Sequence, residues 1–174
     1  MYGSIPIVAL GLLAGSCMGG CVGGCVQING GAVEVSWVVH ANGRAITDCS
    51  CAVAPTADVG APPIAGVRIE IVGQHGAIDG ARPCAGRAQC QFACQRQTGA
   101  TPFDIPETHG GEMYAISVVA MDKDGADLPG IAAPAPILRT VVRGQPTEVE
   151  AFLFEAGCAK ACQGMNKTSV CARP

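Results

Sequence analysis

The sequence predicts an all-β chain: a single, disulfide-rich β-sandwich of six to seven strands behind an N-terminal apolar segment. Apolar and polar residues alternate with a period of two through most of the chain, and no long stretch has the apolar period of a helix. Glycines and prolines separate the alternating stretches, as they separate the short strands of a sandwich. The 11 cysteines predict disulfides, because thiols at this density are unusual in a reducing cytosol.

The alternation defines the expected strands in order along the chain. The first is half-buried, because apolar side chains from Val33 to Val39 alternate with Glu34, Ser36 and His40. The same pattern predicts further strands at residues 67–71, 88–95, 112–121, 136–143 and 146–154.

Turn-forming residues separate the later strands. Residues 122–125, Asp-Lys-Asp-Gly, are typical of a turn, and residues 144–146 make a tight connection. In the last expected strand, Val149, Ala151 and Leu153 occupy one face and alternate with glutamates.

Three irregular stretches carry many of the cysteines. Long loops are expected at residues 41–64 and 73–87, and the tail at 157–174 has no strand pattern and is too short to fold alone, so we expect it to be stapled back onto the domain. Residues 103–105 lie between two prolines and make an edge strand at best. Because recognition usually occurs on loops that a rigid sandwich displays, we expect a partner to contact these loops or the tail.

The N-terminal apolar run ends on Cys17. Residues 5–16 are uncharged over the length of a signal-peptide core, and small residues at 14–16 suit a signal peptidase. This arrangement resembles the lipobox of bacterial lipoproteins, which implies that Cys17 is acylated and becomes the mature N-terminus. Removing Cys17 leaves an even ten cysteines. The expected location is the bacterial cell envelope, as an outer-membrane lipoprotein that is periplasmic or surface-exposed.

A retained membrane helix at residues 5–28 is the alternative to a cleaved signal peptide. No charged residue precedes Glu34, and glycines recur at every fourth position from Gly11 to Gly23. Small residues at that spacing let transmembrane helices approach closely. The full expected organisation is a signal peptide at 1–16 (or the helix at 5–28), a Gly/Cys-rich tether at 17–31, a β-sandwich at 32–156 and a cysteine-rich tail at 157–174.

Composition argues against nucleic acid as a partner and indicates a core of small side chains. The net charge is -3 and no basic stripe is present. Charged residues make up only 14% of the chain and aromatic residues 4%. Because small side chains bury less apolar area, we expect disulfides to supply part of the stability.

Five segments follow one another in a recognisable order: 33–37 (Val-Glu-Val-Ser-Trp), 66–71 (Gly-Val-Arg-Ile-Glu-Ile), 83–84 (Pro-Cys), 114–122 and 147–153. This order resembles the small Ig-like or transthyretin-like lipoproteins of myxobacteria, and also carboxypeptidase-regulatory-type β-sandwiches, over about residues 30–156. The resemblance implies the fold and the envelope location, and it implies little about function. It also implies a disulfide between Cys84 and either Cys49 or Cys51.

The cysteine spacing favours disulfides over a metal site. Cys90 and Cys94 lie on one face of an expected strand, about 13 Å apart between Cα atoms, so each should pair elsewhere. The repeated Cys-x3-Cys spacing leaves a metal or redox protein as an alternative, although structural zinc sites favour shorter hooks, often with histidine. The cysteines assigned to disulfides are Cys49, Cys51, Cys84, Cys90, Cys94, Cys158, Cys162 and Cys171.

No catalytic centre is expected, and no cofactor or metal is assigned. His40, His75 and His109 are isolated in the sequence, and no Gly-x-Ser-x-Gly elbow occurs. Residues 122–127 carry carboxylates spaced like the opening of a calcium loop, but the later glutamate of such a loop is missing, so a turn and a calcium site are the two interpretations.

The sequence therefore predicts a non-enzymatic, envelope-anchored structural or binding subunit. Its expected partners are the membrane, through the lipid anchor or the N-terminal helix, and a protein or a second copy of the chain. On the retained-helix alternative, the chain is a membrane-embedded accessory subunit of a larger complex.

Overall fold

The computed structural model describes residues 31–55, 61–73, 90–103, 113–159, 162 and 171. The expected signal peptide (1–16) and the alternative helix (5–28) lie outside these ranges, as does the tether up to residue 30. Helical structure in the described ranges is confined to short 3-10 turns, and none of it is long and apolar enough to cross a membrane.

The described residues form ten strands and two 3-10 turns. In chain order these are β1 (Gly31–Ala41), β2 (Arg44–Ile46), η1 (Cys49–Cys51), β3 (Ala52–Val53), β4 (Gly66–Gly73), β5 (Gln91–Ala93), η3 (Cys94–Arg96), β6 (Thr98–Phe103), β7 (Met113–Met121), β8 (Ile137–Thr140), β9 (Pro146–Glu148) and β10 (Phe152–Cys158).

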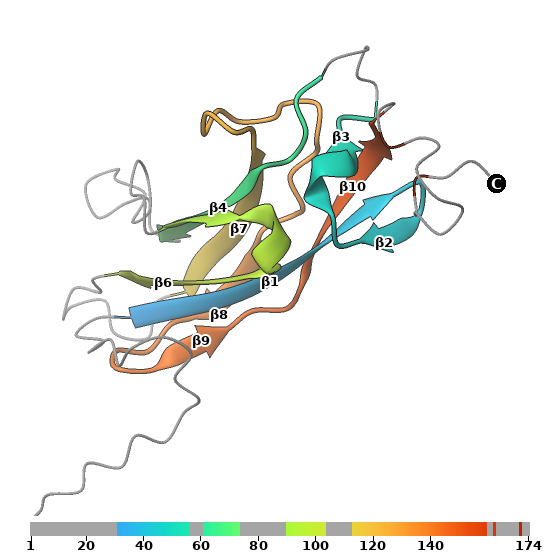
Figure 1. The fold of residues 1–174 in the computed structure, drawn as a ribbon. Helices are drawn as coiled ribbons and strands as arrows, with labels where there is room; N and C mark the ends of the chain where they lie inside the picture. The colour runs from blue at the N-terminus through green and yellow to red at the C-terminus, as the bar shows by residue number, and fades with distance from the viewer. Residues whose placement is uncertain are drawn as a thin grey trace, which may run out of the picture.

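Strand β1 is the centre of a six-stranded sheet. Its first half pairs antiparallel with β6 and parallel with β9, and its second half pairs antiparallel with β2 and parallel with β10. Strand β3 extends the sheet beyond β10. The first and last strands of the domain therefore lie side by side, with Trp37 opposite Phe152 and Ala41 opposite Ala156 (Figure 1).

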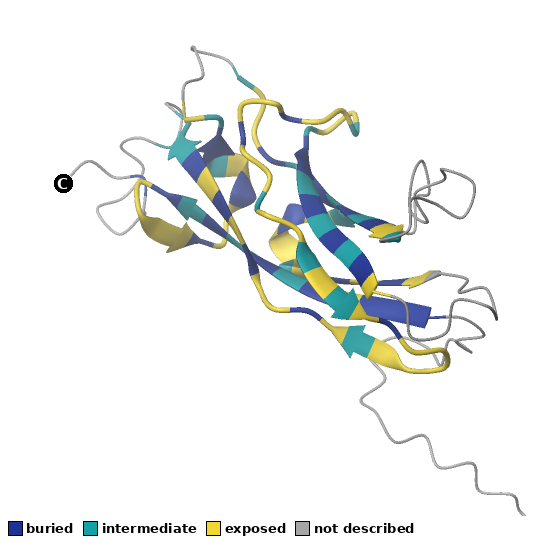
Figure 2. Cartoon of the chain, turned by 180° about the vertical axis from the view of Figure 1, so that it is seen from behind, coloured by how far each residue is buried: buried dark blue, intermediate teal, exposed yellow. Residues whose placement is uncertain are grey.

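The second sheet has four antiparallel strands in the order β5-β4-β7-β8. The register of β4 and β7 runs from Gly66 opposite Met121 to Gly73 opposite Tyr114. Buried and half-buried residues alternate along β4 and β7, dark blue and teal in Figure 2, because successive side chains of a strand point to opposite faces. The buried faces of both sheets contribute to one core, so the chain is all-β with a sandwich-like arrangement of two sheets.

Trp37 is the largest fully buried side chain of the described core. Its side chain is buried, and its indole Nε1 donates a hydrogen bond of 3.0 Å to the backbone oxygen of Cys94. The Trp37 ring also lies 6.3 Å from the ring of Phe92, measured between centroids. The indole therefore joins β1 of the larger sheet to the corner that follows β5.

The expected strands at 33–39, 67–71 and 112–121 are confirmed as β1, β4 and β7. The expected strand at 88–95 is wrong: β5 is three residues long, and η3 then turns the chain toward the other sheet. Gln97 ends this corner in the left-handed conformation, with φ of 57°. Both Cys90 and Cys94 are buried. The alternation of buried residues therefore continues into the corner, although the strand ends before it.

The expected strand at 146–154 is two strands. The buried positions shift by one residue between Val149 and Phe152, so β9 and β10 present opposite phases of the alternation to the core. Ala151 and Leu153, expected on the apolar face with Val149, are therefore exposed, and Phe154 is buried in their place.

One expected loop and one expected edge strand also need correction. The loop expected at 41–64 contains β2, η1 and β3. The short edge strand expected at 103–105 starts earlier, because β6 runs along β1 from Thr98. Most of the loop expected at 73–87 lies outside the described residues.

Candidate functional site

Six cysteines form three disulfides, which gather at the end of the molecule where β1 and β10 finish. The pairs are Cys49–Cys94, Cys51–Cys162 and Cys158–Cys171. Cys90 is also disulfide-bonded, so all seven cysteines of the described ranges are oxidised. These sulfur atoms are consequently not available as metal ligands.

The pairing of Cys84 with Cys49 or Cys51, which the resemblance implied, is wrong. Cys49 bonds to Cys94 and Cys51 bonds to Cys162, so neither has a free sulfur for Cys84. Cys84 itself lies outside the described residues, as does Cys17. The prediction that Cys90 and Cys94 do not pair with each other is confirmed.

The turn η1 is the hub of the disulfide cluster. The Asp48 carboxylate caps it by accepting a hydrogen bond of 3.0 Å from the Ser50 backbone N–H. Cys49 then bonds to η3, at the corner between the two sheets, while Cys51 bonds to the C-terminal tail. The tail is therefore stapled to the domain, as expected from its lack of strand pattern.

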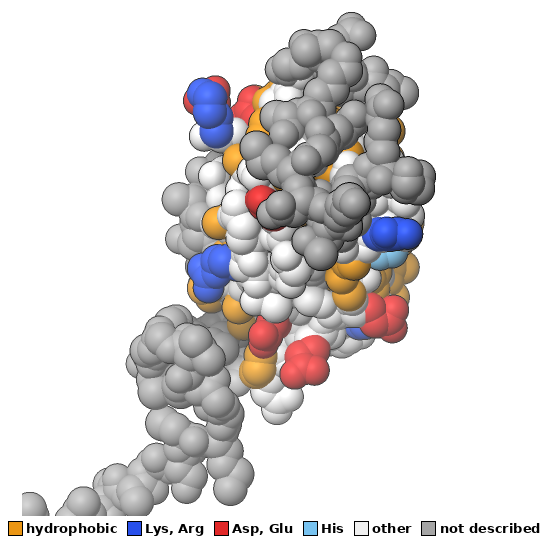
Figure 3. All heavy atoms as spheres, turned by 45° about the vertical axis from the view of Figure 1, so that its right-hand side comes forward, with side chains coloured by type: hydrophobic (Ala, Val, Ile, Leu, Met, Phe, Trp, Pro, Cys, Tyr) orange, Lys and Arg blue, Asp and Glu red, His pale blue; other side chains and the backbone are white. Residues whose placement is uncertain are grey.

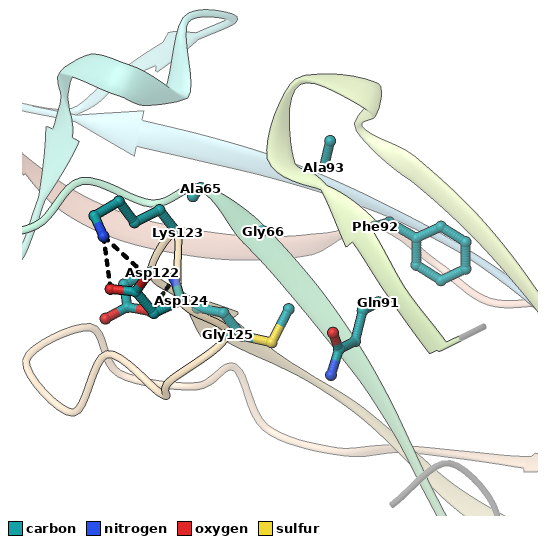
Figure 4. Close-up of a pocket in the computed structure, with 10 residues that line it drawn as sticks. Ala65, Gly66, Gln91, Phe92, Ala93, Asp122, Lys123, Asp124 and Gly125 are labelled. Carbon is teal, nitrogen blue, oxygen red and sulfur yellow. Dashed lines mark hydrogen bonds and ion pairs between the residues drawn. The ribbon is translucent and has the colours of Figure 1, made fainter. Parts of the chain in front are cut away.

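The outer face of the four-stranded sheet has three regions along its length: a groove, a charged network around Arg68 and an apolar end. At one end is a shallow groove of about 360 Å³ between β5 and the turn after β7 (Figure 4). Small residues of β4 and β5 and Met121 form its floor. Its rim is polar. The lining residues are Ala65, Gly66, Gln91, Phe92, Ala93, Met121, Asp122, Lys123, Asp124 and Gly125.

Gly66 lets Met121 and the Phe92 backbone approach closely at the floor of this groove. A Cβ atom at this position would lie 3.1 Å from Met121 Cε and 3.2 Å from the Phe92 backbone oxygen. Sequence reasoning missed the groove because its walls come from strands far apart in the chain. The only local signal is a glycine at the start of a strand pattern, which marks close approach of another segment.

Residues 122–125 form a turn, as expected. The Asp122 carboxylate accepts hydrogen bonds from the backbone N–H groups of Asp124 (2.8 Å) and Ala126 (2.9 Å), and Gly125 has a φ of +80°. Lys123 Nζ lies 2.8 Å from the Asp124 carboxylate at the rim of the groove (Figure 4). The Asp122 carboxylate, which would be the first ligand of a calcium loop, therefore stabilises the turn itself. The described ranges contain no group of three or more potential metal ligands.

Arg68 lies at the centre of the same face. Its guanidinium contacts both oxygens of Asp127, at 2.7 and 3.0 Å, and lies 3.1 Å from Glu70. The hydrogen bond to Asp127 raises the pKa of Arg68, against the opposing effect of burial. This network ties the segment after the turn to β4.

We expect Arg68→Met to lower the free energy of unfolding by about 1–2 kcal/mol, because it leaves two neighbouring carboxylates without their shared cation. Asp127→Asn should cost less, since Asp127 is more than half exposed. Urea denaturation of both variants beside the wild type measures the two values. Equal losses would show that Glu70 contributes nothing to the network.

The far end of the face is apolar. Val72, Ala115 and Leu138 lie in one row across β4, β7 and β8, and Met113 lies beside them opposite Thr140. Val72, Met113 and Leu138 are each more than a third exposed, as is Val142 in the turn that follows β8. We call Val72, Met113, Leu138 and Val142 the terminal apolar patch.

The histidines do not form a site within the described residues. His40 lies on the outer face of the other sheet, where its Nδ1 is 3.6 Å from the Glu155 carboxylate. His75 and His109 lie outside the described residues. Basic side chains on the face shown in Figure 3 lie apart from one another and make no stripe.

Comparison of the chain with models of protein families, with curated proteins and with solved structures found no match.

Proposed function

We propose that this protein is a non-enzymatic lipoprotein of the bacterial envelope, with an Ig-like or transthyretin-like β-sandwich that acts as a structural or binding subunit. The observation that carries the proposal is the disulfide cluster, in which Cys51 and Cys49 of one turn bond to the tail and to the corner between the sheets. Disulfides of this density persist in oxidising compartments such as the periplasm and the cell surface. The lipobox-like ending at Cys17 supplies a means of attachment to the membrane.

A binding or structural role accords with how the loop between β2 and β3 is held. Cys49 and Cys51 of η1, which lies in this loop, are both disulfide-bonded to residues outside it. The Ala159 backbone N–H also donates a hydrogen bond of 2.9 Å to the Cys51 oxygen. A loop fixed in this way loses little conformational entropy when it binds a partner. The partner is a protein of the envelope or a second copy of this chain.

We expect Cys17→Ser to leave an unprocessed precursor and to release the protein from the membrane, because acylation of the cysteine thiol precedes cleavage in lipoproteins. Cys21→Ser is the matched control, since it removes a cysteine from the same glycine-rich segment and leaves Cys17 in place. Intact mass of each protein extracted from envelope membranes reports cleavage, acyl chains and the number of disulfides together.

Two outcomes would contradict the proposal. A wild-type mass that includes Met1 and no acyl chain would favour the retained N-terminal helix, and with it a membrane-embedded accessory subunit. Equal behaviour of Cys17→Ser and Cys21→Ser would show that Cys17 has no special role.

A further inference from the structure

Exposed apolar side chains are concentrated at one end of the domain. Five large hydrophobic residues of the described ranges are exposed, and four of them make up the terminal apolar patch. The fifth, Leu153, lies on the outer face of the other sheet. An unequal distribution of this kind marks a contact surface better than single exposed residues do.

The terminal apolar patch lies at the end of the domain where the chain enters it. After β8, residues 142–145 make a turn closed by a hydrogen bond from Gln145 N–H to the Val142 oxygen. The next residue, Pro146, pairs with Ala32 at the start of β1. Figure 2 shows the end of β8 and the start of β1 at the same end of the molecule.

The segment between Cys17 and β1 limits how far this end lies from an anchored cysteine. Residues 18–30 are uncharged and rich in glycine. For a linker of 13 residues with this glycine-rich composition, we expect a root-mean-square span of about 20 Å. Because such a short link gives a high effective concentration at the membrane, a weak apolar contact is enough to hold the domain there.

We propose that the terminal apolar patch rests on the lipid bilayer to which the chain is anchored. This inference rests on the proposed membrane anchor. The contact is apolar rather than electrostatic, because the charges nearby are mixed: Arg139 pairs with Glu150 at 2.8 Å, and Glu34 and Glu148 face outward on the other sheet. The groove and the disulfide cluster then point away from the bilayer, where a partner reaches them.

A matched pair of tryptophan variants tests this orientation. Leu138→Trp and Leu153→Trp replace leucines of equal exposure, 44% and 43%, on the outer faces of the two sheets. The full chain is extracted from envelope membranes and reconstituted into phosphatidylcholine vesicles, with and without bromine on the upper part of the acyl chains. Trp37 is buried in both variants and contributes the same background.

We expect bromine to quench the tryptophan at position 138 at least about threefold more strongly than the one at 153, because only the former reaches the acyl boundary. Equal quenching in a protein whose mass shows an acylated Cys17 would overturn the orientation and leave the anchor intact. Preferential quenching at 138 in a protein that retains Met1 would support the orientation and refute the lipid anchor. Failure to float with vesicles would refute both. Position-138 cross-links between two chains, without quenching, would show that a second copy covers the patch.

Discussion

Removal of the Cys51–Cys162 disulfide by Cys51→Ala with Cys162→Ala should lower the free energy of unfolding by about 4–5 kcal/mol. The bond joins residues 111 positions apart, so its loss frees the largest loop of the three described disulfides in the unfolded chain. Urea denaturation without reductant measures the loss, and coincidence of fluorescence and circular dichroism transitions tests for two-state unfolding.

The Cys158–Cys171 pair provides the control for this result. These cysteines are only 13 positions apart, and their replacement by alanine should cost about 3 kcal/mol in the same entropy model. A smaller loss for the long loop than for the short one would show that the tail stabilises the native state by contacts rather than by restricting the unfolded chain.

Trp37→Ala should lower the free energy of unfolding by about 3–5 kcal/mol, because it leaves a cavity where both sheets meet. Trp37→Phe should cost about 1–3 kcal/mol, since the ring is partly replaced while the buried Cys94 oxygen loses its donor. Thermal or urea unfolding measures both losses. Circular dichroism is the probe rather than tryptophan fluorescence, because both variants lack the only tryptophan of the chain.

Leu153→Ala is the reference for the two substitutions of Trp37. Leu153 is exposed, so its truncation should change stability by no more than about 0.5 kcal/mol. If Trp37→Phe were as stable as the wild type, the hydrogen bond to Cys94 would contribute nothing, and the indole would act through packing alone.

Alternation in the sequence predicts the strands that keep one phase along their whole length. β1, β4 and β7 each bury every second side chain over most of their length, and each was expected at its position. The prediction fails where a buried residue lies outside a strand, and where the alternation of buried residues shifts by one position. At Cys94 a buried residue belongs to a corner, and between Val149 and Phe152 the alternation changes phase.

The surfaces of the four-stranded sheet were harder to foresee. The turn at 122–125 has a local cause, because its aspartates and glycine favour turns wherever they occur. The terminal apolar patch depends on the register that brings Val72, Ala115 and Leu138 into one row, and register is a property of strand pairs. The disulfide partners likewise depend on which loops the two sheets bring together.

The parallel pairing of β1 with β10 has a consequence for the proposed export of the chain to the envelope. Of the strands that the structure describes, β1 is synthesised first, and its long parallel neighbour β10 is synthesised last. The central sheet therefore cannot close until nearly the whole domain is present, and contacts so distant in sequence form slowly. On the proposed envelope location, a chain whose central sheet stays open until β10 is synthesised remains a substrate for a narrow export channel. Folding and oxidation would then both follow export.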